Sequence, residues 1–339
     1  MKTVLVTGAS SFLGYHVVKQ LNERGIRPRV IELPGGNRDV LERLGVEQCS
    51  GDLDHEASMR AACAGVETLV HLAFKVSVGG GTTLIDDMRR VNVDGTRRLL
   101  QAANAAGVRR AVVAGSALAV AVSRQATPLA ESDSSPENAF DIPYARIRRE
   151  AELDALALST PGFDVVSVCP SFTFGPDDPT GAPANKLLDA IITRKMRFTL
   201  PVGFGCLDVR DFGSGVLLAA DRGHAGERYL LSGENITATE LIERVAVLSG
   251  VRPARFTPPT FLLHAAVGAL ELICTVRGKP APITRDVLQI IGRYAWYDTS
   301  KARTQLGWTT RPLQQTLADT IAWLRDSHRP ERRASMSVV

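Results

Sequence analysis

Two glycines near the amino end have the spacing of a phosphate-binding turn between an apolar run and a helical pattern. Gly8 permits a tight turn, Gly14 lets the helix pack closely on the strand, and small Ser11 stands where a middle glycine is expected. The helix N-terminus would present free N–H groups to a pyrophosphate, although an ordinary βα turn is the alternative. The candidate cofactor-binding residues here are Gly8, Ser10, Ser11, Phe12, Leu13 and Gly14.

Two carboxylates follow the next two predicted strands and suit the adenosine end of a dinucleotide. Glu32 could accept hydrogen bonds from the ribose hydroxyls and would repel a 2′-phosphate, which favours NAD over NADP. Arg29 and Arg38 are close enough in sequence to neutralise a phosphate, or to pair with Glu32 at the surface. Asp52, followed by Leu53, could hold the adenine amino group, or could simply favour a turn.

The cysteines and histidines do not have the spacing of a metal site. The five cysteines are far apart without a Cys-x-x-Cys pair, which predicts reduced thiols and a cytoplasmic protein. The six histidines are scattered, and His71 in an apolar run is expected to be a hydrogen-bonded core residue. A net charge of +4 over 339 residues is too small to indicate binding to nucleic acid.

Predicted strands and helices, which must position these residues, alternate over the first half of the chain. Apolar runs at residues 4–6, 30–31, 46–49, 68–73, 111–113 and 165–169 are separated by helical patterns, including 84–106 and 144–157. Apolar runs without alternation suit strands that are buried on both faces. The repeated units predict an α/β fold with a Rossmann-type, doubly wound parallel sheet.

The regular alternation ends after Pro170. We expect a dinucleotide-binding domain at residues 1–171, to which 203–236 return, and a smaller, mostly helical substrate domain at 172–202 and 237–328. Residues 329–339 are expected to form a disordered tail. The apolar stretch 261–274 is too short to span a bilayer; it predicts a buried helix, with a membrane-surface patch as the alternative.

Motifs along nearly the whole chain resemble those of the extended short-chain dehydrogenase/reductase family. Besides the glycine turn they are Val70-His71-Leu72-Ala73, Asn92-Val93-Asp94-Gly95-Thr96, Tyr144-x-x-x-Arg148, Phe174-Gly175-Pro176 and Asp208-Val209-Arg210-Asp211. The later motifs are most similar to the branch of dihydroflavonol-reductase-like enzymes and 3β-hydroxysteroid dehydrogenases. Sugar epimerases share the same framework.

The resemblance implies a serine and a tyrosine as catalytic residues. Ser116 follows the fifth strand, and its hydroxyl would hydrogen-bond the substrate oxygen. Tyr144 matches the acid/base tyrosine, which gives a proton during reduction or takes one during oxidation, while hydride passes between substrate and nicotinamide. Further positions that match cofactor-lining residues are Leu72, Ala73, Phe74 and Pro170.

Arg148 stands where the family has a lysine, and it shares a helix face with Tyr144. Its permanent charge can still favour an ionised phenol and donate to the ribose hydroxyls, so we assign it a catalytic and a cofactor-binding role. An arginine cannot release a proton, so any relay through this position is closed. A surface ion pair with Glu152, one turn on, is the alternative.

These residues predict an NAD(P)-dependent oxidoreductase that interconverts a ketone and a secondary alcohol on a bulky, partly apolar substrate. A nucleotide-sugar epimerase that retains NAD is one alternative, and a non-catalytic dinucleotide-binding sensor or scaffold is another. The expected partners are a small-molecule substrate and a second copy of the chain, held through the helices of residues 84–106 and 144–157. Nucleic acid and a membrane span are not expected.

Overall fold

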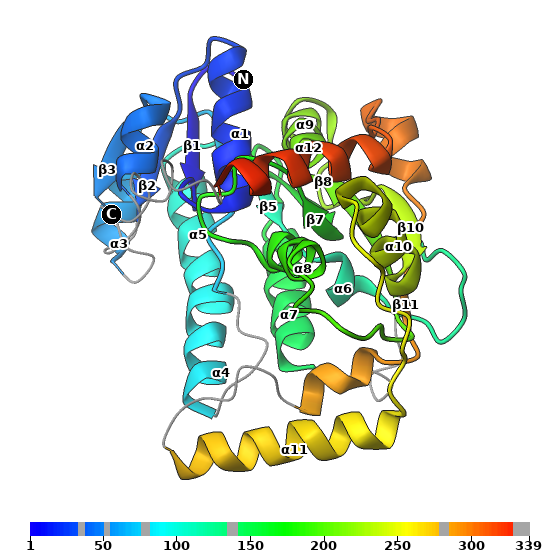
Figure 1. The fold of residues 1–339 in the computed structure, drawn as a ribbon. Coiled ribbons are helices and arrows are strands. Elements are labelled where there is room, and N and C mark those ends of the chain that lie inside the picture. The colour runs from blue at the N-terminus through cyan, green and yellow to red at the C-terminus, as the bar shows by residue number, and fades with distance from the viewer. Residues whose placement is uncertain (33–37, 51–54, 76–81, 134–141, 278–284, 328–339) are drawn as a thin grey trace.

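The computed structural model describes residues 1–32, 38–50, 55–75, 82–133, 142–277 and 285–327. Its central feature is a seven-stranded parallel sheet of order β3-β2-β1-β4-β5-β6-β9 (Figure 1). The strands are β1 (Val4–Thr7), β2 (Arg29–Glu32), β3 (Glu47–Ser50), β4 (Thr68–His71), β5 (Arg110–Ala114), β6 (Asp164–Pro170) and β9 (Arg228–Leu231). The strand order reverses between β1 and β4, and dinucleotides bind at such a switch point. The predicted α/β fold is therefore confirmed.

Alternating side chains of the strands bury both faces of this sheet. Val4 and Val6 pack in one apolar cluster with α1 (Phe12–Glu23), α2 (Arg38–Leu44) and α9 (Val209–Arg222). Leu5 packs in a second cluster with α3 (Glu56–Cys63), α5 (Thr96–Ala105) and α7 (Pro143–Ala157). Successive strand residues point to opposite faces, so one apolar run fills two cores.

The predicted long helix of residues 84–106 is three consecutive segments. It comprises α4 (Thr82–Arg89), the π-helical turn η1 (Arg90–Gly95) and α5. The wider turn places Asn92 in the interior, with none of its surface exposed. Such π-helical turns occur often at functional sites, and Asn92 faces the loop that follows β4.

The second half of the chain contains a sheet that the sequence patterns did not predict. β7 (Phe172–Phe174), β10 (Glu234–Thr237) and β11 (Tyr294–Ala295) all pair with β8 (Gly203–Asp208). It packs in an apolar cluster with α8 (Pro183–Ile192), α10 (Ala238–Ser249) and α12 (Leu313–Ser327). Within the returning segment 203–236, α9 and β9 lie with the large sheet, whereas β8 and β10 belong to the small one.

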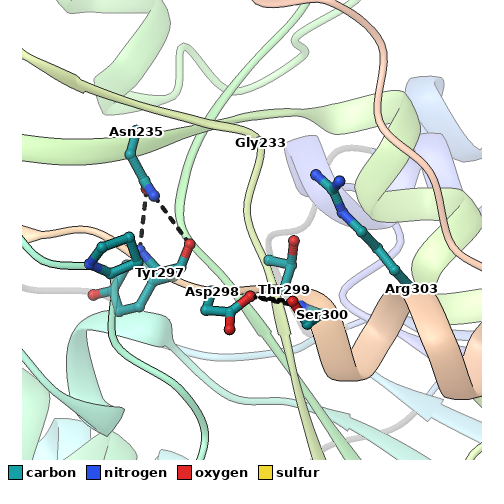
Figure 2. A pocket seen from close by; sticks show the side chains of 8 residues that line it. Gly233, Asn235, Tyr297, Asp298, Thr299, Ser300 and Arg303 are labelled. Carbon is teal, nitrogen blue, oxygen red and sulfur yellow. Dashed lines mark hydrogen bonds between the residues drawn. The ribbon is translucent and has the colours of Figure 1, made fainter.

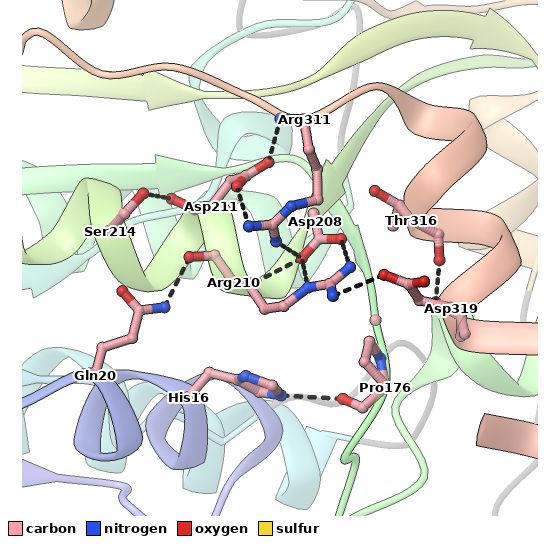
Figure 3. A network of polar contacts seen from close by, with 12 residues as sticks. His16, Gln20, Pro176, Asp208, Arg210, Asp211, Ser214, Arg311, Thr316 and Asp319 are labelled. Atoms are coloured by element: carbon pink, nitrogen blue, oxygen red, sulfur yellow. Dashed lines mark hydrogen bonds and ion pairs between the residues drawn. The ribbon is translucent and has the colours of Figure 1, made fainter. Parts of the chain in front are cut away.

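A network of charged side chains links the two parts of the molecule (Figure 3). The carboxylate of Asp208, which is 3% exposed, accepts hydrogen bonds from Arg210 and Arg311 at 2.7–2.9 Å. Arg210 also pairs with Asp319 on α12 at 2.7 Å, and its carbonyl accepts a 2.8 Å bond from Gln20 on α1. The start of α9 thus joins α1 to α12.

The apolar stretch 261–274 forms α11 (Thr260–Val276), and the prediction that it is buried is wrong. Phe261, Leu272 and Val276 are 70%, 66% and 79% exposed. Among the described elements, α11 makes its main contact with the short η2 (Arg285–Ile290), and Figure 1 shows it crossing the lower end of the molecule. Hydropathy alone does not reveal that α11 is exposed, because an apolar helix need not be covered by another element of the fold. Within the described residues, no helix combines the length and apolar content needed to cross a bilayer.

Candidate active site

The glycine turn lies at the switch point of the large sheet. Gly8 follows β1 with a φ of +73°, and a Cβ atom there would lie 2.7 Å from the amide nitrogen of Ala73. A Cβ on Gly14 would overlap the carbonyl oxygen of Gly8. Only glycines allow the turn, the start of α1 and the segment after β4 to approach so closely. The geometry is that of a pyrophosphate-binding turn.

Ser11 has a structural role within this turn. Its hydroxyl donates to the carbonyl of Gly8 at 2.7 Å and accepts the N–H of Gly14 at 3.1 Å, as the N-cap of α1. The first turn of α1 carries no acidic side chain, and the leading N–H groups of a helix have no partner within it. Ser10 lies in the same turn, Phe12 is buried and Leu13 is half-buried. The backbone here therefore suits an anion.

A buried chain of hydrogen bonds fixes the end of β4 against this turn. His71 Nδ1 lies 2.7 Å from Oγ1 of Thr7, and its Nε2 lies 2.9 Å from Oγ1 of Thr96. The amide of Ala73 donates to Thr7 Oγ1 at 3.2 Å. Burial, and then the charge of Arg148, lower the pKa of His71 from 6.5 to about 3, so the ring is neutral. The prediction that His71 is a hydrogen-bonded core residue is confirmed.

Asn92 holds the segment that follows β4 through two hydrogen bonds to Lys75, a contact that the sequence did not predict. Its Oδ1 accepts the amide of Lys75 at 2.8 Å, and its Nδ2 donates to the carbonyl of Lys75 at 2.8 Å. This bond pair holds the segment that contains Leu72, Ala73 and Phe74, of which the first two are buried. The Asn92-Val93-Asp94-Gly95-Thr96 motif was the available signal, but spacing alone does not show which loop the amide reaches.

The structure describes only some of the residues that are predicted to bind adenosine. Glu32 is the last residue of β2, and in register it is the partner of Ser50 in β3. Asp52 and Leu53 lie outside the described residues. Arg29, offered as a partner for a phosphate or for Glu32, pairs with Glu47 at 2.9 Å and donates to two backbone carbonyls.

Ser116, Tyr144 and Arg148 come from two elements that meet at the carboxyl end of β5. Ser116, 7% exposed, precedes the short α6 (Ala117–Val120), and its side chain makes no capping bond to it. Tyr144 is the second residue of α7, which begins at Pro143, and is half-buried. Pro170 ends the neighbouring strand β6. The parallel strands place these positions at one edge of the sheet.

Arg148 is 4% exposed and is held on two sides. Its Nη2 donates to the carbonyls of Ala114 and Gly115 at 2.7 and 2.6 Å, and its Cζ lies 3.5 Å from the ring centre of Phe74. Burial lowers the pKa of Arg148, and the phenol of Tyr144 opposes that shift. Since a guanidinium stays charged in proteins, this site holds a fixed cation beside the phenol.

Two nitrogens of Arg148, Nε and Nη1, are buried without a hydrogen-bond partner among the described residues. Unpaired buried donors are costly, so a polar ligand that accepts from them would stabilise this arrangement. The nicotinamide ribose offers such acceptors, and the residues present therefore fit a dinucleotide.

The alternative of a surface ion pair between Arg148 and Glu152 is wrong. Glu152 is 2% exposed and pairs with Arg228 of β9 at 3.2 Å. Its other oxygen accepts hydrogen bonds from Ser167 at 2.5 Å and from Cys169 at 2.9 Å. This cluster lies inside the fold because α7 and the strands β6 and β9 bring its members together.

A polar pocket of ≈ 460 Å³ lies in the smaller part of the molecule (Figure 2). Its lining comprises Pro128, Gly233, Asn235, Tyr297, Asp298, Thr299, Ser300 and Arg303, none of which is a predicted site residue. The Asn235 amide exchanges two 3.0 Å bonds with the backbone of Tyr297, and Asp298 accepts two bonds from Ser300. These polar groups stabilise a loop, and we do not assign the site to them. Among the described residues, no three His, Cys, Asp or Glu side chains are grouped to hold a metal ion.

The switch-point turn and the cation-flanked tyrosine define a dinucleotide-dependent enzyme of the Rossmann class. The model of the NAD dependent epimerase/dehydratase family matches residues 4–231 of this chain. The chain therefore belongs to this family and is an extended short-chain dehydrogenase/reductase.

Several known proteins are similar to this chain over almost its full length. Sterol demethylase protein B of Methylococcus capsulatus is 33% identical over 328 residues, 96% of this chain and 98% of that protein. A 4-hydroxy-2-methyl-3-oxo-4-farnesyl-3,4-dihydroquinoline-1-oxide ketoreductase of Stigmatella aurantiaca is 29% identical over 321 residues, 93% and 94% of the two chains. The crystal structure of gox2253 superimposes with a TM-score of 0.84 at 29% identity, covering 97% and 99%. The chain is an NAD(P)-dependent oxidoreductase.

Proposed function

We propose that this enzyme interconverts a ketone and a secondary alcohol, with Ser116, Tyr144 and Arg148 as its catalytic residues. The observation that carries the proposal is the buried guanidinium of Arg148, which lies near Tyr144 and has two donors without a described partner. When bound, the nicotinamide supplies or accepts the hydride. The glycine turn, Leu72, Ala73, Phe74 and Pro170 would hold the cofactor.

Tyr144 would move the proton in this reaction. In the reducing direction its phenol gives a proton to the carbonyl oxygen, and the hydroxyl of Ser116 donates a second hydrogen bond to that oxygen. Arg148 stabilises the phenolate that remains, because its charge is fixed and two carbonyls orient it. Solvent must return the proton to Tyr144, since an arginine does not release one.

The proposed substrate is bulky and partly apolar. The names of the two similar enzymes refer to a sterol and to a farnesylated quinoline. We place this substrate between the carboxyl edge of the large sheet and the smaller part of the chain, residues 172–202 and 237–328. The dinucleotide would lie on residues 1–171.

The proposed coenzyme is NAD. Glu32 ends β2, next to the strand that leads into the glycine turn, where a carboxylate favours a free ribose over a 2′-phosphate. Asp52 and Leu53 would contact the adenine.

We also propose a cytoplasmic homodimer. All five cysteines are unpaired, as in a reducing compartment. The dimer would form through the helices of residues 84–106 (α4, η1 and α5) and α7, where Leu153 is 47% exposed beside the ion pairs Arg97–Asp154 and Arg89–Glu150. Light scattering of the purified protein tests the mass, and a monomer at micromolar concentration would contradict the dimer.

The function is tested by a panel of sterol, polyketide and aliphatic ketones, with consumption of NADH and NADPH followed by absorbance. Turnover of apolar ketones with a preference for NADH is the expected result. Tight copurified NAD without net consumption, together with epimerisation of nucleotide sugars, would instead identify an epimerase. Cofactor binding without any turnover would identify a binding protein.

A further inference from the structure

The outward face of α11 is apolar along its whole length. Seventeen residues at about 1.5 Å each make a helix of about 25 Å. The exposed residues that share about 140° of its circumference are Phe261, Leu262, Ala265, Ala266, Ala269, Leu272, Ile273 and Val276. The helix's histidine and glutamate, the exposed His264 and the half-buried Glu271, lie outside this stripe. This is the reverse of an ordinary surface helix, which turns its apolar face to the core.

Exposed cations stand at both ends of this apolar face. Arg255 lies five residues before α11, and Arg277 directly follows it; both are exposed. The carbonyl of Phe256, which is 63% exposed, accepts the amide of Thr199 at 2.8 Å. That bond ties the chain segment of the exposed Arg197 to residue 256, four residues before the helix. Glu271 is the only acidic residue between positions 255 and 277.

This distribution of charge favours a lipid surface over a second copy of the chain as the partner of the apolar face. In an antiparallel pairing of α11 with a second copy, Arg255 of one chain would approach Arg277 of the other, and no carboxylate on the face could compensate. An apolar stripe that carries Phe261, with arginines beyond both ends of the helix, instead matches a lipid surface with anionic headgroups.

We propose that α11 is a membrane-surface helix that lies in the plane of an anionic bilayer. Its apolar face enters the boundary between headgroups and acyl chains, and Arg255 and Arg277 contact the headgroups. The helix lies on the bilayer and does not cross it. Figure 1 shows α11 below α4 and α7, the helix that carries Tyr144, so the bilayer would lie on this side of the enzyme.

Flotation of the full-length protein with lipid vesicles tests this proposal directly. We expect binding to vesicles that contain phosphatidylglycerol to be at least about tenfold tighter than binding to pure phosphatidylcholine, and to weaken with salt. The double variant Leu272→Ser/Ile273→Ser should weaken binding at least about tenfold. Arg255→Gln/Arg277→Gln should remove the preference for anionic vesicles.

A matched control is available on α10, where Val247 is 82% exposed. Val247→Ser removes a similarly exposed side chain and should leave vesicle binding unchanged. All variants should keep the thermal midpoint and the NAD affinity of the parent, because the altered side chains are exposed. Absence of flotation, or equal flotation of the Leu272→Ser/Ile273→Ser variant, would overturn the proposal. A concentration-dependent dimer that this variant abolishes in lipid-free solution would assign the face to a second copy.

Discussion

The guanidinium carbon of Arg148 lies 3.5 Å from the ring centre of Phe74, and Nη2 of the same side chain donates to two backbone carbonyls at the end of β5. Stacking and hydrogen bonding thus orient one cation from two sides. A planar guanidinium can do both, whereas the ammonium of a lysine is a compact point charge. We therefore expect the arginine at this position to have a role that a lysine does not reproduce.

We expect Arg148→Lys to lower kcat/KM about tenfold, because the lysine loses the stacked orientation beside Tyr144. Phe74→Leu should cause a similar loss in the parent but a much smaller one in the Arg148→Lys background. A double-mutant cycle on kcat/KM and on NAD affinity measures this coupling. Independent effects of the two substitutions, or faster turnover with lysine, would contradict a specific role for the Arg148–Phe74 pair.

Tyr144→Phe should lower kcat about 10²- to 10⁴-fold, the usual contribution of a positioned acid or base. The NAD dissociation constant should stay within about twofold, since only one hydroxyl is lost. Single-turnover kinetics and fluorescence titration of the coenzyme check the two quantities. Full activity in this variant would show that the proton comes from another group.

Gly8→Ala should weaken NAD binding at least about tenfold, because the new Cβ would lie 2.7 Å from the backbone of Ala73. Gly25→Ala is the matched control. Gly25 has nearly the same φ, +74° against +73°, but no atom lies within 4 Å of its Cβ position. Both variants incur the left-handed backbone strain, and only Gly8→Ala disturbs the turn. Calorimetric titration of NAD compares them, and equal losses would refute the assignment of the turn.

His71 should make the free energy of unfolding depend on pH. Burial lowers its pKa from 6.5 to about 3, so between these values the unfolded chain binds a proton that the folded chain does not. The stabilisation is complete above about pH 6.5 and is lost as the pH falls towards 3, by up to about 1.4 kcal/mol per pH unit.

Urea unfolding at about pH 7 and about pH 5 measures this dependence. The variant His71→Asn should lose less stability between the two conditions than the parent, although it is less stable in both. His16, whose pKa is also lowered by burial, contributes the same slope to both proteins and cancels in the comparison. Identical pH slopes would show that His71 does not titrate as inferred.

The amino-acid sequence by itself determined six of the seven strands of the large sheet, all but β9, and the position of the glycine turn. Local rules suffice there, because apolar runs buried on both faces and a strand–glycine–helix order have few other solutions. The same local logic correctly placed His71 in the core as a hydrogen-bonded residue.

Only the tertiary structure decided what several of these side chains contact. Ser11 caps α1 through its own turn, Glu152 pairs with Arg228, and Arg148 contacts β5 and Phe74. In each of the last two cases the partners come from elements far apart in the chain, so no spacing in the sequence reveals them. The exposure of α11 has the same cause: hydropathy states what a helix would bury, and only the packed fold shows whether a partner covers it.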